Sequence, residues 1–154
     1  MGVIEIRRED LTSPTAQALI GELNAELRKR YPEDGVSYFR LDPDEVEPGR
    51  GTFLVAYAAD LPVACGAVRL IAKDAAEIKR MYVAPASRRC GVARRVLDAL
   101  EAEARKLGVT RVLLETGPRQ PEAIALYEKA GYVPTQPFGE YEASPLNVFF
   151  EKRL

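Results

Sequence analysis

Histidine is absent from the 154 residues of this sequence. Its absence excludes catalysis by Ser-His or Cys-His pairs and removes the commonest metal ligand of proteins. Cysteine is scarce: Cys65 lies in an apolar stretch and Cys90 in a basic one, and their spacing fits neither a disulfide framework nor a metal site. We therefore expect two reduced thiols, no metal ion, and acid–base chemistry carried by carboxylates, tyrosines or lysines.

Net charge is also nearly absent, because 22 basic residues face 23 acidic ones and leave a formal charge of -1. Such a chain has no general attraction for nucleic acid or for anionic membranes. No apolar run approaches the roughly 20 residues of a membrane span, and the first residues, with Glu5, Glu9 and Asp10, do not resemble a signal peptide. We expect a cytoplasmic protein that forms one domain over residues 1–154.

Apolar periodicity divides the chain into strands and helices. Their order predicts an α+β fold, a mixed sheet covered by helices, in which the two strands joined by the second helix run parallel. Ser13 is expected to cap the first helix and Gly108 to end the second. The segment 31–51 is expected to be a partly ordered excursion. The predicted strands are Val3–Ile6, Thr52–Ala58, Pro62–Ile71, Glu77–Val83, Val109–Thr116 and Leu146–Glu151, and the predicted helices are Pro14–Arg30, Cys90–Leu107 and Pro121–Gly131.

The segment Val83–Ala93 lies between a predicted strand and the start of a long amphipathic helix. The first turn of a helix carries unpaired backbone N–H groups and a partial positive charge, so it can bind phosphate. Gly91 leaves this turn open, and Arg88 and Arg89 add positive charge with a geometry suited to phosphate oxygens. The same residues could open an ordinary solvated helix. A Walker loop or a dinucleotide fingerprint would need residues that this segment does not contain.

Two segments together resemble the signatures of the GNAT acetyltransferase superfamily. Arg88-x-x-Gly91-x-Ala93 resembles the diphosphate-binding signature, and Gln120–Tyr132 resembles the second signature, Asn-x-x-Ala-x-x-Leu-Tyr-x-x-x-Gly-Phe/Tyr. Both occur in their usual order and separation, and the resemblance covers roughly residues 50–152. It implies the GNAT fold: one central, twisted, mixed and mostly antiparallel sheet with a splayed parallel strand pair, flanked by about four helices.

The resemblance also implies acetyl-CoA as co-substrate. Its pantetheine arm would lie in the opening between the strand that ends at Val83 and the strand that ends near Glu115. One departure is Gln120, which stands where the family often has an asparagine that contacts the cofactor. The implied cofactor-binding residues are Met81, Tyr82, Val83, Arg88, Arg89, Cys90, Gly91, Val92, Ala93, Arg94, Gln120 and Tyr127.

Acetyl transfer from a thioester requires a neutral amine, whereas a lysine-type amine, with a pKa of about 10.4, is protonated at neutral pH. A base is therefore needed. Glu77 is the first candidate, because several GNAT enzymes place a catalytic glutamate six residues before the position of Val83. Glu115 is the second candidate. Glu77 could instead pair with Lys79 or Arg69 across the predicted hairpin.

Tyr127 occupies the motif position at which the GNAT phenol donates a proton to the departing thiolate. It could instead be a core aromatic residue packed with Ile124. The tetrahedral oxyanion would be held by a backbone N–H near Tyr82. A covalent acetyl-cysteine route competes with direct attack in a ternary complex, but Cys90 lies in the phosphate segment and Cys65 has no histidine to activate it.

No motif encodes the acceptor amine. Residues of the excursion and of a later loop are expected to line its site, and those named for it are Tyr31, Tyr38, Arg40 and Tyr141. They could equally form a solvated, acid-rich loop whose aromatic side chains cover the core. Two rival functions are a non-catalytic acetyl-CoA sensor or interaction module and, against the charge balance, a nucleic-acid-binding domain. Homodimerisation through the last strands, common in this fold, is left open by the sequence.

Overall fold

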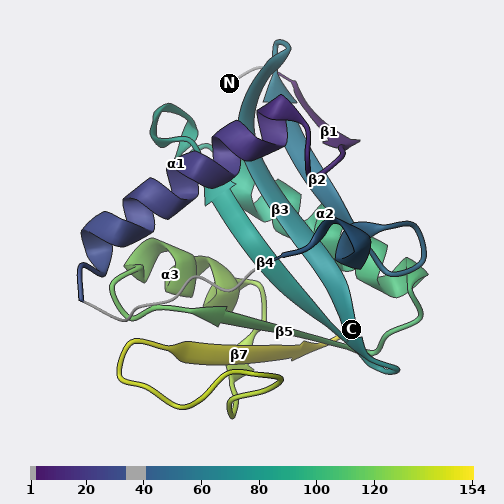
Figure 1. Cartoon of the computed structure of the whole chain (residues 1–154), viewed down its shortest axis with the longest axis vertical. Helices are drawn as coiled ribbons and strands as arrows, with labels where there is room; N and C mark the ends of the chain where they lie inside the picture. The colour runs from purple at the N-terminus through teal and green to yellow at the C-terminus, as the bar shows by residue number, and fades with distance from the viewer. Residues whose placement is uncertain (1–2, 34–40) are drawn as a thin grey trace.

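The computed structural model describes residues 3–33 and 41–154, in which seven strands form one sheet with three α-helices and two 3₁₀ helices packed around it (Figure 1). The resemblance implied about four helices, and in the described part of the excursion we find the single 3₁₀ turn η1. The strands are β1 (Ile4–Arg8), β2 (Gly51–Ala58), β3 (Leu61–Ala72), β4 (Ala75–Val83), β5 (Arg111–Thr116), β6 (Val133–Pro134) and β7 (Val148–Arg153). The helices are α1 (Pro14–Arg30), η1 (Pro43–Val46), η2 (Pro85–Ser87), α2 (Val92–Lys106) and α3 (Pro121–Lys129).

The sheet is antiparallel except at its centre. Its strand order is β1-β2-β3-β4-β5-β7-β6, and β4 and β5, which α2 connects, form the parallel pair. The pairing of β4 with β5 ends at Ile78 and Leu114, although β4 continues to Val83. The predicted mixed α+β fold with a splayed parallel pair at its centre is therefore confirmed.

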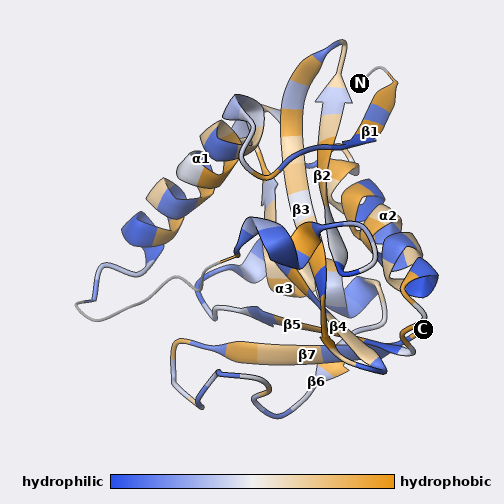
Figure 2. Cartoon of the chain, turned by 45° about the vertical axis from the view of Figure 1, so that its right-hand side comes forward, coloured by the Kyte–Doolittle hydropathy of each residue, from blue (hydrophilic) through white to orange (hydrophobic). Residues whose placement is uncertain are grey.

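Each face of the sheet carries its own apolar core. On one face, Leu97 and Leu100 of α2 are fully buried in a cluster that also contains Tyr127 of α3. On the opposite face, Leu19 and Leu23 of α1 are buried in a second cluster (Figure 1). Strand β3 is apolar along most of its length because it is covered on both sides (Figure 2).

The first helix begins and ends where the sequence predicts. Ser13 accepts a hydrogen bond through its Oγ from the N–H of Ala16 at 3.0 Å, and Pro14 occupies the first helical position. A proline is tolerated there because its missing N–H would have no partner in the helix. None of the helices within residues 3–33 and 41–154 is long and apolar enough to cross a membrane.

The second helix is shorter than predicted at its start. It begins at Val92 and not at Cys90, because Gly91 has a φ of +79° and forms the N-cap in a left-handed conformation. At its end, Gly108 has a φ of +84° and donates its N–H to the carbonyl oxygen of Arg105 at 3.0 Å, so the predicted cap is confirmed.

Strand β4 begins two residues before its predicted start and β5 two residues after it, and further differences lie at the C-terminal edge of the sheet. The last strand is Val148–Arg153, two residues later than expected, and the two-residue strand β6 was not predicted. β6 pairs with β7 at the edge and contains Pro134. So short a strand, with a proline, carries no periodicity from which it could be predicted.

Candidate active site

The two parallel strands separate at the position where the predicted site begins. Arg80 has a φ of +58°, and the pairing of β3 with β4 shifts register opposite it, between Cys65 and Ala67. A left-handed residue within a strand marks a β-bulge, which bends the strand. The bulge lies two residues beyond Ile78, the last residue of β4 that pairs with β5. Strand β4 therefore turns away from β5 and leaves an opening between them.

A cavity of about 540 Å³ lies at this opening. Segments that are far apart in the sequence line it: α1, β4, β5 with the loop that follows, α3, and the segment 140–147. As far as the described residues define it, the lining includes neither Glu77 nor the phosphate segment 83–93. The predicted site residues that line the cavity are Tyr31, Met81, Glu115, Gln120, Tyr127 and Tyr141.

Glu115 reaches the cavity from the end of β5. Burial raises the pKa of its carboxyl to about 8, and the negative charge of Glu77 adds to this rise. Lys79 and Arg80 act in the opposite direction and lower the pKa of Glu115. A carboxylate whose pKa lies near neutral pH is suited to accept a proton from an amine.

Glu77 lies on β4 before the cavity-lining residue Ile78, with 1% of its surface exposed. Its Oε1 accepts hydrogen bonds from Nε and Nη2 of Arg69 at 3.1 and 2.9 Å, and its Oε2 accepts one from the Tyr141 hydroxyl at 2.5 Å. Arg69 also pairs with Glu45 of η1. The predicted alternative, a pair between Glu77 and Arg69 across the hairpin, is confirmed. Both oxygens of the Glu77 carboxylate thus have partners that hold β3, β4, η1 and the Tyr141 loop together.

Tyr127 lines the cavity from α3 and is 5% exposed. Its ring packs edge-on against Tyr132, with 5.8 Å between ring centroids, so it is also part of the core. Burial raises the pKa of the phenol, and the charge of Glu115 raises it further. Among the described residues, no side chain that forms a hydrogen bond with its hydroxyl contributes to this pKa. The phenol therefore stays protonated at neutral pH and can donate a proton into the cavity.

The predicted phosphate segment forms the turn between β4 and α2. A Cβ atom placed on Gly91 would meet nothing within 4 Å, so the turn is open. In the described part of the chain, no backbone carbonyl accepts the N–H groups of residues 89–94. Such a helix start offers several N–H groups to one anion. Of the predicted residues here, Arg89, Cys90, Gly91 and Arg94 are exposed, Val83, Arg88 and Ala93 are partly exposed, and Tyr82 and Val92 are buried.

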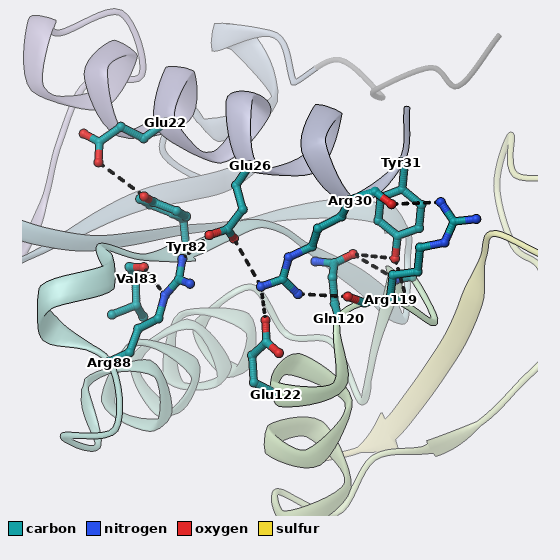
Figure 3. Close-up of polar contacts among 11 residues, drawn as sticks. Glu22, Glu26, Arg30, Tyr31, Tyr82, Val83, Arg88, Arg119, Gln120 and Glu122 are labelled. Carbon is teal, nitrogen blue, oxygen red and sulfur yellow. Dashed lines mark hydrogen bonds and ion pairs between the residues drawn. The ribbon is translucent and has the colours of Figure 1, made fainter. Parts of the chain in front are cut away.

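The guanidinium of Arg88 is bound to the protein itself. Its Nε donates to the carbonyl oxygen of Val83 at 2.8 Å, and its Nη2 donates to Oε1 of Glu26 on α1 at 2.6 Å (Figure 3). The guanidinium also lies 5.6 Å from the ring centroid of Tyr82. The positive charge that the sequence assigned to a phosphate is thus already paired with a carboxylate.

Arg30, one helical turn after Glu26, extends this contact toward α3. It lies 3.9 Å from Glu26 and 2.5 Å from Glu122, and it donates to the carbonyl oxygen of Arg119 at 2.9 Å (Figure 3). We call Arg88–Glu26–Arg30–Glu122 the α1 ion-pair chain. It joins the phosphate segment to the start of α3, the two segments that carry the GNAT signatures.

Gln120 contacts α1 and the loop after β5. Its Oε1 accepts the N–H of Gly117 at 3.1 Å and the hydroxyl of Tyr31 at 3.3 Å, and that hydroxyl accepts the N–H of Arg119 at 2.9 Å (Figure 3). A Cβ atom on Gly117 would lie 1.8 Å from the Tyr31 hydroxyl oxygen, so any larger residue here would displace the Tyr31 side chain. A predicted cofactor contact, Gln120, and a predicted acceptor contact, Tyr31, therefore touch each other in the cavity wall.

The remaining sequence predictions concern the excursion and the thiols. Tyr38 and Arg40 lie outside the described residues. Cys65 is fully buried, and burial raises its pKa to about 12, whereas Cys90 is exposed. A buried, protonated thiol is a poor nucleophile. Among the described residues, no three side chains of the metal-binding types lie close enough together to hold an ion.

Residues 16–132 match the Acetyltransferase (GNAT) family. The chain belongs to this family. It is 38% identical over 152 residues to an IAA acetyltransferase of Azospirillum brasilense, and the match covers 98% of both chains. Membership makes this GNAT protein an acyltransferase.

Solved structures agree with this assignment. A Klebsiella pneumoniae protein that is classed with the acyl-CoA N-acyltransferases superposes with a TM-score of 0.86 at 33% identity, covering 99% of this chain and 98% of its own. The PaiA N-acetyltransferase of Thermoplasma acidophilum, solved in complex with coenzyme A, has a TM-score of 0.73 at 18% identity and covers 99% and 100%. The similarity to the Thermoplasma protein, at 18% identity, is one of fold alone.

Sequence reasoning did not assign four side chains of this GNAT site. Lys79 and Arg80 both line the cavity, and two adjacent cations in a predicted strand were the available signal. Glu26 and Arg30 have the i, i+4 spacing of a helix-surface pair, which is visible in the sequence. Their partners on the phosphate segment and on α3 lie dozens of residues away, so no local pattern connects them.

Proposed function

We propose that this GNAT protein binds acetyl-CoA and transfers its acetyl group to the primary amine of an acceptor by direct attack in a ternary complex. The observation that carries the proposal is the cavity at the opening between β4 and β5, because it combines the Glu115 carboxyl with the Tyr127 phenol. Family membership supports the reaction class. The coenzyme A found in the Thermoplasma protein of the same fold supports the cofactor.

Acetyl-CoA would bind along the opening. Its diphosphate would accept hydrogen bonds from the N–H groups of residues 89–94 at the start of α2, and the pantetheine arm would lie between the separated strands. The thioester would then lie in the cavity near Met81 and Tyr127. Because Arg88 is paired with Glu26, we assign most of the diphosphate binding to backbone groups and not to that guanidinium.

Glu115 and Tyr127 would handle the protons. An acceptor ammonium first gives one proton to the Glu115 carboxylate, and the free amine then forms a bond to the acetyl carbonyl carbon. As the tetrahedral intermediate collapses, the C–S bond breaks and the CoA thiolate takes a proton from Tyr127. The nitrogen loses its second proton, which returns to Tyr127 through water, and Glu115 later releases its proton to solvent. The products are an N-acetylated acceptor, free CoA and one proton.

Two measurements test this proposal. Calorimetry should detect binding of CoA, and release of CoA thiol should follow when acetyl-CoA and a panel of amines are supplied. Glu115→Gln should abolish the rise of kcat/KM with pH through about 8, whereas Glu142→Gln, at the exposed cavity mouth, should leave it in place. A protein that binds CoA and releases no thiol with any amine would be a sensor, and the proposed catalysis would be wrong.

A further inference from the structure

The orientation of the Tyr127 phenol in the cavity wall depends on how its ring is packed. Burial and the charge of Glu115 are what shift the pKa of the phenol, and no hydrogen bond from a described residue contributes to that shift. The Tyr127 ring packs against two other rings. Tyr132 lies edge-on to it with 5.8 Å between ring centroids, and Phe150 of β7 lies 6.4 Å away at an angle of 46°. Contacts that fix these neighbours therefore also fix the phenol.

Tyr132 is fixed through both its backbone and its side chain. Its N–H donates to the carbonyl oxygen of Tyr127 at 3.0 Å, and its hydroxyl donates to Oε2 of Glu101 on α2 at 2.8 Å. Nζ of Lys152 on β7 donates to both carboxylate oxygens of Glu101, at 2.9 and 3.1 Å, and lies 5.6 Å from the centroid of the Tyr132 ring. We call Lys152, Glu101 and Tyr132 the Glu101 cluster. It joins α2, β7 and the turn that follows α3.

The burial of a charge at Glu101 stands out on its helix. Six residues of α2 are buried, and Glu101, with 3% of its surface exposed, is the only one of the six that carries a charge. A largely buried ion pair adds little stability compared with apolar side chains of similar volume, because both charges lose hydration. Its charge-assisted hydrogen bonds do impose direction on their partners. The Glu101 cluster is therefore better explained by the orientation that it gives to Tyr132 than by stability.

We infer that Glu101 and Lys152 are positioning residues for acid catalysis, which hold the Tyr127 phenol, through the Tyr132 ring, where it gives its proton to the CoA thiolate. As far as the described residues define the cavity, neither Glu101 nor Lys152 lines it, so both act through another residue. A displacement of about 1 Å at a reacting group can slow a reaction about a hundredfold, so a remote support of this kind has a measurable effect. The inference rests on the proposed role of Tyr127 and names what orients it.

Two substitutions of Tyr132 test the inference. Tyr132→Phe keeps the ring and removes its bond to Glu101, whereas Tyr132→Leu also removes the ring contact with Tyr127. CoA release is measured with acetyl-CoA and the fastest acceptor among spermidine, leucine and kanamycin. The value of kcat should fall roughly threefold in Tyr132→Phe and roughly tenfold or more in Tyr132→Leu. The Kd of CoA from calorimetry should stay within about twofold of the wild-type value, because the phenol acts on the transition state.

A double-mutant cycle separates the orientation of Tyr127 from a general loss of stability. In a Tyr127→Phe background there is no phenol to orient, so adding Tyr132→Phe should not lower kcat further. Glu101→Leu should lower kcat as Tyr132→Phe does, and Glu101→Gln, which keeps an oxygen that can accept the Tyr132 hydroxyl, should restore part of it. Tyr57→Phe is the matched control, because the Tyr57 hydroxyl donates to the carboxylate of Glu9 in the core on the other face. It should lower stability in urea and leave kcat unchanged.

The outcomes distinguish this inference from the proposed function. If Tyr132→Phe lowers kcat by the same factor in both backgrounds, or no more than Tyr57→Phe does, the inference is wrong and acetyl transfer stands. If CoA binds and no amine releases its thiol, the proposed catalysis fails and the inference with it. Should Tyr132→Leu or Glu101→Leu not fold, a crystal structure of Tyr132→Phe with CoA decides. A Tyr127 hydroxyl displaced by about 1 Å, or found in two positions, supports the inference, and an unmoved hydroxyl contradicts it.

Discussion

Replacing Glu115 by glutamine should lower activity and raise stability, and the gain in stability should grow with pH. In the folded protein burial raises the pKa of this carboxyl to about 8, against an ordinary value of 4.5 in the unfolded chain. Between pH 4.5 and pH 8 the Glu115 carboxyl is mostly ionised in the unfolded chain and mostly protonated in the folded protein. Stability is therefore lost as pH rises, by about 1.36 kcal/mol per pH unit, reaching about 3 kcal/mol at pH 7 and about 4 kcal/mol at pH 8, where the folded carboxyl is half ionised.

Urea denaturation of the wild type and of Glu115→Gln between pH 5 and pH 8 measures this loss. Other ionisable groups are present in both proteins and cancel in the difference of the two unfolding free energies. That difference should be small near pH 5 and increase steadily up to pH 8. The packing of glutamine changes this difference by the same amount at every pH. The slope of the difference against pH therefore reports the titration of Glu115.

Glu142→Gln is the control, because Glu142 is exposed at the cavity mouth. The difference in unfolding free energy between Glu142→Gln and the wild type should not change with pH. A Glu115→Gln difference that is equally flat would refute the reasoning, because the carboxyl would then titrate alike in both states. Loss of turnover together with a gain in stability would identify Glu115 as a group whose burial is costly and serves function.

Three further substitutions test the cofactor side of the site. Glu26→Gln releases the guanidinium of Arg88, so calorimetry should show CoA binding about two- to fivefold tighter at low salt and little changed at high salt; weaker binding would mean that Glu26 positions Arg88. Tyr127→Phe should reduce kcat at least roughly tenfold and leave CoA affinity unchanged, and full activity would exclude the phenol as the acid. Gly117→Ala should cost about 1–3 kcal/mol in urea denaturation, and less in a Tyr31→Leu background, since its Cβ would meet both the hydroxyl oxygen and Cζ of Tyr31; an equal cost in both would contradict that contact.

The fold was largely predictable because its determinants are local or periodic. The bounds of α1 follow from Ser13, Pro14 and an apolar repeat, and the end of α2 follows from Gly108. The parallel pairing of β4 with β5 follows from the helix between them. What failed were short features decided by neighbours, such as the edge strand β6 and the start of the last strand.

The site was predictable only in part, for the same reason. The GNAT signatures pointed to Tyr127 and the Gly91 turn, and Glu115 was only the second candidate for the base, after Glu77. They could not indicate that Glu77 has both oxygens engaged, because one partner, Tyr141, lies 64 residues away. Nor could they indicate the pair of Arg88 with Glu26, which are 62 residues apart. Tertiary contacts of this separation leave no trace in a local pattern.

The α1 ion-pair chain has a consequence for protein engineering. Helix α1 supplies Leu23 and Leu27 to the cavity that we propose for the acceptor. Through Glu26 and Arg30 it also pairs with Arg88 and Glu122, which lie on the two segments that we propose to bind the cofactor. A chimera that borrows α1 from another acetyltransferase to change the acceptor would therefore also retune the affinity for acetyl-CoA. Only a transplant that retains these two charges would allow acceptor choice to be redesigned without disturbing the cofactor.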